Sequence, residues 1–231
     1  MSIFEDDFNI FYRKIIKLKK SQNRRKRGRP SLSQELNMDN LLSVALEYFS
    51  DLGFEGTQLK FIAEKTGVTN PLISYHFSNK EELWKRSIDY LSKLIIEKFE
   101  AIRSDLKDIE GVPMLRSYTR QLIYFCAKNP PFYKIIYMEM GQNSWRSDYL
   151  INSIIGPLTT IGQSALNKAS TNPKFTAIPQ PNFVSIIFGA CSSFFMLTRL
   201  IEHQYDISTF EHVHIEKHAD LVNQIIFDSF E

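Results

Sequence analysis

The densest set of reactive side chains lies near the start of the chain. No acidic residue stands between Asp7 and Glu35, and the segment carries ten basic residues: Arg13, Lys14, Lys17, Lys19, Lys20, Arg24, Arg25, Lys26, Arg27 and Arg29. Of the 28 Lys and Arg in 231 residues, these ten leave 18 against 26 Asp and Glu, so the remainder is acidic. A block of like charge cannot fold on itself and commonly binds a polyanion. We therefore predict a basic arm over residues 1–34, with a solubilising tail as the alternative.

A second group of reactive side chains is a set of histidines late in the chain. His212, His214 and His218 lie within seven residues, and the last two have the i, i+4 spacing that lets one helix face hold a metal ion. The sequence HIEKH is not the HExxH of zinc proteases, because its glutamate stands one place late. A solvated helix face or a subunit contact explains these histidines more simply, so we expect no metal and no cofactor.

The other reactive residues form no catalytic arrangement. No nucleophile arrangement, paired carboxylates or phosphate-binding glycine loop stands out in the sequence. Cys126 and Cys191 lie far apart without CxxC pairing, which suits a reducing compartment and argues against a disulfide scaffold. We expect a cytoplasmic protein that is not an enzyme.

Membrane insertion is not expected either. The longest nearly uncharged apolar run, residues 183–197, is too short for a span and carries three serines. The opening MSIFEDD is acidic where a secretory signal would be basic. Residues 8–18 mix apolar and basic side chains and could lie on an anionic membrane, but we expect an extension without membrane contact.

The elements that carry these residues are predicted to be helices. Apolar residues recur with a 3.6-residue period from Met38 to the end, and almost no segment shows the two-residue alternation of strands. Asn37 is the expected N-cap of the first helix and Gly53 its stop. Thr57 is expected to cap a short second helix.

Later helices follow the same rules. Ser78 and Glu81 have capping-box spacing ahead of a stripe of about 25 residues. Further helices are predicted near 114–128, 132–141, 147–168, 182–204 and 208–230. Pro157 falls inside one of them and should kink it. The chain is thus predicted to be all-α, with about nine helices.

The stretch TGVTNPLISYHFSNKEEL, residues 66–83, carries turn residues inside helical sequence. A sharp turn between two short helices needs a residue that tolerates positive φ, and Gly67 supplies it. Val68 can plug the small core, Thr69 can cap the next helix, and Pro71 falls in its first turn, where a missing N–H costs nothing. These are the mechanics of a helix-turn-helix, whose third helix lies in the DNA major groove.

Residues 42–83 resemble the N-terminal DNA-binding domain of the TetR family of bacterial transcriptional regulators. The matching residues are Ala45, Phe49, Gly53-Phe54, Thr57, Ile62-Ala63, Gly67-Val68-Thr69, His76-Phe77, Ser78-Asn79-Lys80-Glu81 and Leu83. The sequence departs from the family pattern at Ser74, where a tyrosine usually precedes the histidine by two residues. Tyr75 stands next to it, and either side chain could make the phosphate contact of that tyrosine.

The resemblance implies a division of the chain and a set of DNA contacts. A three-helix DNA-binding domain would occupy residues 35–80, and a connecting helix with a larger ligand-binding and dimerising domain would occupy 81–231. Asn70 is expected at a base edge, Leu72 at a thymine methyl group, and Arg27 and Arg29 in the minor groove of A·T-rich DNA. The other expected contact residues are Thr57, Thr69, Pro71, Ser74, Tyr75, His76 and Lys80.

The C-terminal domain is expected to bind a small apolar or aromatic inducer. The candidate pocket residues are Tyr118, Gln121, Tyr124, Phe125, Tyr137, Met138, Trp145 and Arg146, each of which could instead be ordinary core. The resemblance also implies a homodimer through residues 182–230, where Gly189, Ala190, Ser192 and Ser193 would allow close approach.

These features together predict a ligand-responsive repressor that binds a palindromic double-stranded DNA operator as a dimer. Two other readings stay open. An architectural protein for A·T-rich DNA would use the basic arm and need no inducer, and a metal-responsive sensor would use His214 and His218.

Overall fold

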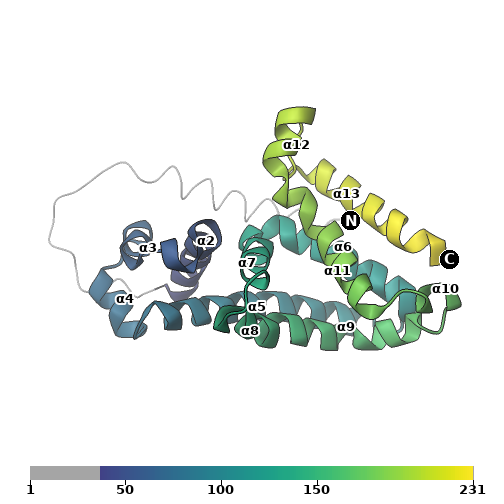
Figure 1. The fold of residues 1–231 in the computed structure, drawn as a ribbon, viewed down its shortest axis with the longest axis horizontal. Coiled ribbons are helices and arrows are strands. Elements are labelled where there is room, and N and C mark those ends of the chain that lie inside the picture. Colours follow the sequence, from purple (N-terminus) through teal and green to yellow (C-terminus); the bar gives the residue numbers. More distant parts are fainter. Residues whose placement is uncertain (1–36, 231) are drawn as a thin grey trace. The chain divides into compact units, whose positions relative to one another are not determined.

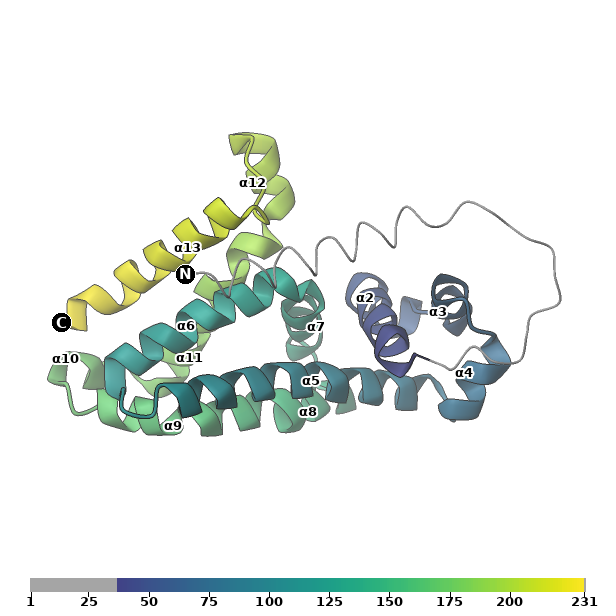
Figure 2. The same cartoon turned by 180° about the vertical axis from the view of Figure 1, so that it is seen from behind.

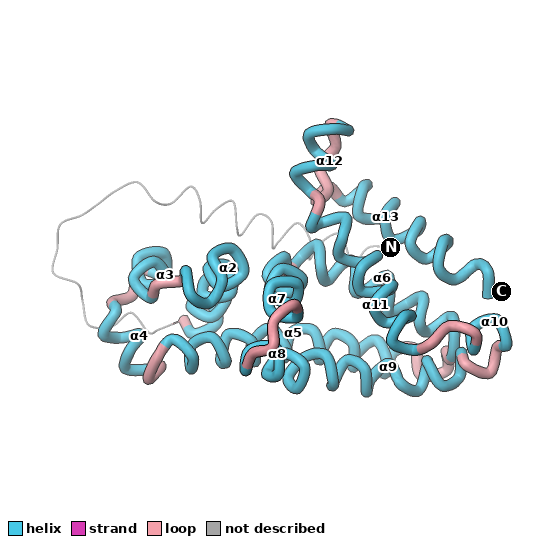
Figure 3. Tube along the Cα trace, viewed as in Figure 1, coloured by secondary structure: helices cyan, strands magenta, loops and turns pink. Residues whose placement is uncertain are grey.

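The computed structural model describes residues 37–230, and the predicted basic arm with Arg27 and Arg29 lies outside them. Within that range every regular element is a helix (Figure 1, Figure 3). The predicted all-α class is therefore confirmed. The predicted number of about nine helices is too low, because two of the expected long helices are interrupted.

Three short helices open the described part of the chain: α2 (Met38–Gly56), α3 (Leu59–Thr66) and α4 (Asn70–His76). Asn37 caps α2 as predicted, since its side-chain oxygen accepts a hydrogen bond from the Asn40 N–H at 3.0 Å. The helical path of α2 breaks at Gly53, the predicted stop, where φ is 72° and ψ is 172°. Residues Leu41, Ala45, Phe49, Ile62, Ala63, Ile73 and Phe77 are buried and form the core of this trio.

A long helix, α5 (Lys80–Asp105), follows the trio, and its 26 residues match the predicted length. Its N-cap is Asn79, whose side chain accepts from the Glu82 N–H at 2.8 Å. The predicted capping box of Ser78 and Glu81 is therefore wrong by one residue, because the helix begins at Lys80 and Asn79 occupies the N-cap position. Helix α5 packs against α2 at one end and against α6 and α9 further along (Figure 2).

The larger helical body surrounds α6 (Gly111–Lys128), which packs against several later helices. These are α7 (Pro130–Met140), α9 (Gly156–Ala169), α11 (Gln180–Met196) and α13 (His212–Phe227). The shorter elements are α8 (Trp145–Leu150), the π-turn η1 (Ile151–Ile155), α10 (Pro173–Thr176), α12 (Thr198–Tyr205) and the 3-10 turn η2 (Asp228–Phe230). Helix α12 contains no buried residue.

The interruption near Pro157 has a clear physical cause. Proline has no N–H to offer the carbonyl four residues earlier, which here belongs to Ser153. The hydroxyl of Ser92, on α5, donates to that carbonyl at 2.5 Å. Around this place the helix changes to the π-helical turn η1 between α8 and α9, and the kink expected from Pro157 stays a prediction. Similarly, the expected helix 182–204 is divided at Leu197 into α11 and α12.

No single helix in residues 37–230 has the length and apolar composition needed to cross a membrane. Helices α11 and α12 meet that test only as a pair, across a bend of 57°.

Replacing Ser92 by alanine should destabilise the protein by about 1 kcal/mol, because the partly buried Ser153 carbonyl loses its donor. The free energy of unfolding from urea titration measures the change. Ser87→Ala is the matched control, since the buried Ser87 hydroxyl donates only to Leu83, a carbonyl of its own helix, at 2.7 Å. Equal losses in the two variants would show that the contact between α5 and η1 adds nothing.

Candidate nucleic-acid interface

The turn between α3 and α4 has the geometry that the sequence predicts. Gly67 adopts the left-handed conformation with φ 75° and ψ 12°, which an L side chain rarely takes. Ala63 is buried at the close approach of the helices, and Val68 packs partly buried against the core. The Gly67 backbone thus makes the turn after which α4 begins, with Thr69, Asn70 and Pro71 exposed.

The start of α4 is organised by backbone more than by side chain. Thr69 occupies the N-cap position, and its carbonyl accepts from the N–H groups of Leu72 and Ile73 at 3.0 and 3.2 Å. Its side chain makes no capping hydrogen bond, so the predicted capping role of the hydroxyl is wrong. Pro71 lies in the first turn, as predicted. The Thr69 hydroxyl is therefore left on the exposed surface.

Helix α4 has one buried and one exposed face. Ile73 and the following Phe77 are buried in the trio, and Leu72 is half-buried. The remaining predicted contact residues of this helix are exposed: Thr69, Asn70, Pro71, Ser74, Tyr75 and His76. Tyr75 is 83% exposed, which for a large aromatic side chain is unusual without a partner. The arrangement presents hydrogen-bonding groups and an aromatic ring on one short, firmly anchored helix.

Thr57 does not have the role expected from sequence. The N-cap of α3 is Gln58, which makes no side-chain cap, and the hydroxyl of Thr57 donates instead to the carbonyls of Gly53 at 2.7 Å and Tyr48 at 3.0 Å. Thr57 is only 1% exposed. This hydroxyl satisfies carbonyls at the broken end of α2, so the predicted cap is wrong and the side chain faces the protein interior.

Lys80 is also engaged inside the protein. Its ammonium group donates to the carbonyls of Glu55 and Thr57 at 3.3 and 3.4 Å and lies 4.5 Å from the ring centre of Phe54. The sequence suggested only a phosphate contact at the start of a long helix. The long-range contacts of this lysine, more than 20 residues back along the chain, carry no local sequence signal.

The predicted pocket residues divide into two groups, and neither group lines the two grooves described below. Tyr118 and Phe125 are buried against Phe99 and Phe132, at ring distances of 5.4 and 5.2 Å. The Tyr124 hydroxyl donates to Glu216 at 2.7 Å, and burial together with this hydrogen bond raises the pKa of Tyr124.

Two further members of this first group are more exposed. The Tyr137 hydroxyl lies 3.0 Å from the hydroxyl of Ser192 on α11, and Gln121 is half-buried on α6. Within the group, Tyr118 and Phe125 thus belong to the core, whereas Tyr124 and Gln121 are half-buried and Tyr137 is 43% exposed.

The second group lies against the DNA-binding trio. Met138, Trp145 and Arg146 contact the broken end of α2: the Met138 sulfur stands 3.2 Å from where a Cβ of Gly53 would be, and Trp145 packs edge-on to Phe54 at 5.6 Å. The Arg146 guanidinium lies 5.1 Å from the centre of the same ring. These three side chains join the body to α2.

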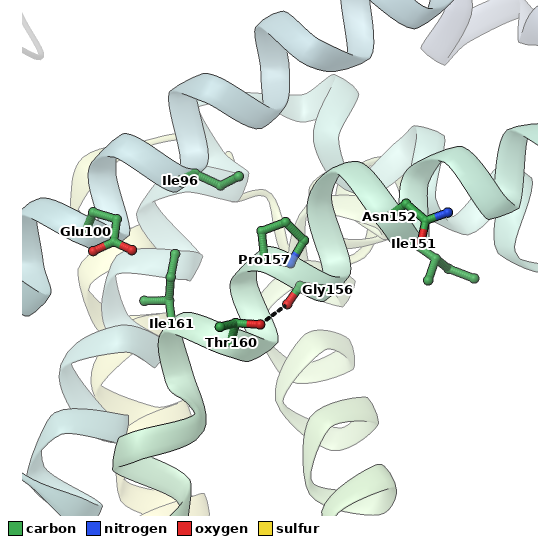
Figure 4. Close-up of a pocket in the computed structure, with 8 residues that line it drawn as sticks. All are labelled: Ile96, Glu100, Ile151, Asn152, Gly156, Pro157, Thr160 and Ile161. Carbon is green, nitrogen blue, oxygen red and sulfur yellow. Dashed lines mark hydrogen bonds between the residues drawn. The ribbon is translucent and has the colours of Figure 1, made fainter.

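Two grooves occur elsewhere on the body. One, of about 510 Å³, lies between α5 and the region of η1 and α9 (Figure 4) and is lined by Ile96, Glu100, Ile151, Asn152, Gly156, Pro157, Thr160 and Ile161. The other, of about 560 Å³, is lined by Ile136, Met140, Ile155, Gln180, Pro181, Val184, Ser185 and Phe188. None of the eight predicted pocket residues lines either groove. The sequence carries one signal for the second groove: Val184 and Phe188 are apolar and four residues apart, so they share one helix face. Helices buried in a protein core show the same spacing.

The histidines do not gather around a common point. The His218 Nε2 donates to the Ala190 carbonyl at 2.9 Å, and its ring stacks on Phe194 at 4.6 Å. Burial lowers the pKa of His218. His214 faces Glu211 at 3.8 Å. In residues 37–230 no group of three or more His, Cys, Asp or Glu side chains has an arrangement suited to a metal ion. His218 thus serves the packing of α13 on α11.

Comparison with known proteins agrees with this geometry. The model of the family described as bacterial regulatory proteins, tetR family, matches residues 41–86. The transcriptional regulator RutR of Escherichia coli is 28% identical over 113 residues, which are 49% of this chain and 52% of RutR. The biofilm operon negative regulator IcaR of Staphylococcus epidermidis is 27% identical over 74 residues, 32% of this chain and 40% of IcaR. The chain thus spans about half the length, or less, of these curated relatives.

The fold of the whole described region has known counterparts. The transcriptional regulator FadR of Bacillus subtilis, solved in complex with stearoyl-CoA, superposes with a TM-score of 0.61 at 17% identity, covering 83% of this chain and 98% of FadR. A likeness at this identity establishes the fold alone. The family match, in contrast, covers the turn at Gly67 and the whole of α4, the two features on which the exposed helix depends. Residues 41–86 are therefore a helix-turn-helix DNA-binding domain of the TetR family of bacterial transcriptional regulators.

Proposed function

We propose that this protein is a ligand-responsive repressor that binds a palindromic DNA operator as a homodimer. The observation that carries the proposal is α4: a short helix anchored by Ile73 and Phe77, with Asn70, Ser74 and Tyr75 exposed on its outer face. A helix of this kind fits the major groove, and two copies one DNA turn apart read two half-sites. The proposed division is an arm at 1–34, a DNA-binding domain at 35–80 and a regulatory domain at 81–231.

The proposed contacts follow from exposure. Asn70 can bind a base edge through its amide, Leu72 can contact a thymine methyl group, and Thr69 can reach a phosphate. The 83% exposure of Tyr75 supports it as the partner of a phosphate in place of the tyrosine that the family usually carries at the position of Ser74. Arg27 and Arg29 stay proposed as a minor-groove clip.

The dimer proposal is supported by exposed apolar side chains on α11 and α13, two helices that pack on each other. Ile186 is 54% exposed and Ile225 is 77% exposed. Gly189 has open space where a Cβ would stand, which leaves room for a partner helix. Ser192, in contrast, is buried and bonds to the Phe188 carbonyl at 2.5 Å, so its side chain faces the body.

The proposed ligand is apolar and lipid-like. The groove between α7 and α11 is lined mainly by apolar side chains, with Gln180 and Ser185 as uncharged polar groups and no charged residue. Such a lining suits a hydrocarbon chain. FadR, which shares the fold, was solved with stearoyl-CoA, so a long acyl compound is the first ligand to test.

Selection of random duplexes by the purified protein tests the DNA-binding part. We expect one palindrome with half-sites about a turn apart. Recovery of A·T-rich DNA without dyad symmetry would instead support an architectural protein that acts through its basic arm.

Asn70→Ala should weaken binding to the selected operator by about 1–3 kcal/mol and relax the base preference at one position in each half-site. Fluorescence anisotropy with labelled duplexes, varied one base at a time, measures both effects. Asn167→Ala, which changes an exposed asparagine of α9, is the control and should bind as the unchanged protein does. A loss that is uniform over all duplexes would contradict the assignment of Asn70 to a base.

Stearoyl-CoA should release the protein from its operator, whereas coenzyme A alone should not. Met140→Glu should raise the acyl compound concentration needed for release by about tenfold or more, because it buries a charge against the chain. Leu94→Glu is the control, since Leu94 lines neither groove and shares the 37% exposure of Met140. An unchanged response in Met140→Glu would place the ligand elsewhere.

A further inference from the structure

The link between the DNA-binding trio and the body is concentrated at the end of α2. We call residues 53–57, from Gly53 to Thr57, the α2 elbow. Gly53 breaks the helix with φ 72°, and the chain then passes through one more turn into the loop before α3. The elbow is the last part of α2 before the helices that present α4, so its orientation bears on where α4 lies.

Phe54 is the hub of the elbow. Its ring lies 4.5 Å from the Lys80 ammonium and 5.1 Å from the Arg146 guanidinium, and the Trp145 ring packs edge-on at 5.6 Å. Two cations and an aromatic edge therefore bind the negative face and rim of one ring. Lys80 comes from α5, whereas Trp145 and Arg146 come from α8. The ring thus joins three helices.

Arg146 is held in place by a buried ion pair. Its Nε donates to Glu139 Oε2 at 2.8 Å, and the two side chains are only 13% and 4% exposed. The Nη1 atom of Arg146 lies 3.9 Å from Oε1 of Glu55, which belongs to the elbow. Glu139 lies on α7 and Arg146 on α8, so the pair fixes the two helices to each other and aims one guanidinium at the elbow.

Met138 completes the contact from the body side. Its sulfur stands 3.2 Å from the position of a Cβ on Gly53, so a side chain there would require Met138 to shift by a few tenths of an ångström. The body therefore touches the elbow through consecutive positions of α7 and α8: Met138 beside the buried Glu139, and Trp145 beside Arg146. A shift of α7 relative to α8 cannot leave these contacts unchanged.

We infer that Arg146, oriented by Glu139, is a positioning residue that fixes α4 for DNA through Phe54 and Glu55 of the elbow. A displacement of α7 or α8 then reaches α4 by rearranging this contact. The inference rests on the proposed function and deepens it, because it names the residues through which the body sets DNA affinity. Such coupling requires that DNA binding and ligand binding each favour one arrangement of this contact.

The ion pair of Glu139 and Arg146 could instead serve stability alone. Variants that remove one or both of the buried charges distinguish this role from the positioning of α4. Arg146→Met leaves the Glu139 carboxylate buried without its partner, which should lower the midpoint of thermal unfolding by several degrees. The double variant Glu139→Gln, Arg146→Met removes both charges, so it should regain most of that midpoint. Neither variant restores the contacts of the guanidinium with Phe54 and Glu55.

The chain also carries a spectroscopic reporter at this contact. It has two tryptophans in all, Trp84 and Trp145, and their rings lie 5.2 Å apart beside the elbow. Trp84 is 1% exposed and Trp145 is 37% exposed. Intrinsic tryptophan emission therefore reports on this junction, and it should shift when the operator saturates the protein.

The test measures operator affinity and unfolding midpoint in the full chain for four proteins, at a temperature where circular dichroism shows each to be folded. They are the unchanged protein, Arg146→Met, the double variant and Arg116→Met. Arg116 is the matched control, because it also combines an ion pair, to Asp228 at 2.7 Å, with a ring contact, to Phe227 at 5.6 Å, and does so at α13 and η2.

We expect Arg146→Met and the double variant to bind operator about tenfold more weakly, a typical coupling between sites, while Arg116→Met binds normally. In the double variant the midpoint of thermal unfolding should recover, whereas the operator affinity should stay low. Normal affinity in Arg146→Met, recovery of both properties in the double variant, or an emission spectrum unmoved by operator would each overturn the inference. Failure of the unchanged protein to bind any selected duplex would instead refute the proposed function, and the inference with it.

Discussion

A protein built from helices alone must satisfy backbone carbonyls wherever a helix breaks, and this constraint governs the structure. At the break of α2, the hydroxyl of Thr57 donates to the carbonyls of Tyr48 at 3.0 Å and Gly53 at 2.7 Å, and Lys80 donates to the carbonyls of Glu55 and Thr57. At Pro157 the carbonyl of Ser153 accepts the hydroxyl of Ser92 at 2.5 Å. Ser92 and Lys80 both belong to α5, so at each break a donor comes from another helix. Each break is consequently a place where two helices are joined.

This principle links the DNA-binding domain to the body. The trio of α2, α3 and α4 buries a small core, which by itself offers limited stability for a domain of this size. Lys80 and Trp84 of α5 and Trp145 and Arg146 of α8 enclose the end of α2 and extend that core. The exposed face of α4 can therefore stay polar, because anchoring is supplied from behind. The residues of α4 that we propose for DNA recognition therefore differ from the residues that attach this domain to the body.

Much of the fold was predictable because its signals are local. Gly67, Pro71 and Asn37 act on their own or neighbouring residues, and the structure gives each the expected backbone role. The cap expected from Thr57 was wrong, and the intramolecular contacts of Lys80 were not predicted, because their partners, Tyr48 and Glu55, lie outside the window in which capping rules operate. Met138, Trp145 and Arg146 were read as pocket residues since aromatic and soft side chains line pockets and interfaces alike. Helical periodicity reports which face is buried and not which helix buries it.

The contact between Ser92 and Ser153 also divides α5 in a particular way. Ser92 stands 12 residues after Lys80 and 13 residues before Asp105, so the bond meets the helix close to its midpoint. At 1.5 Å per residue, each arm is about 18–20 Å long. The bond therefore separates the half of α5 that begins at Lys80, beside the end of α2, from the half that carries Ile96 and Glu100 beside the groove (Figure 4).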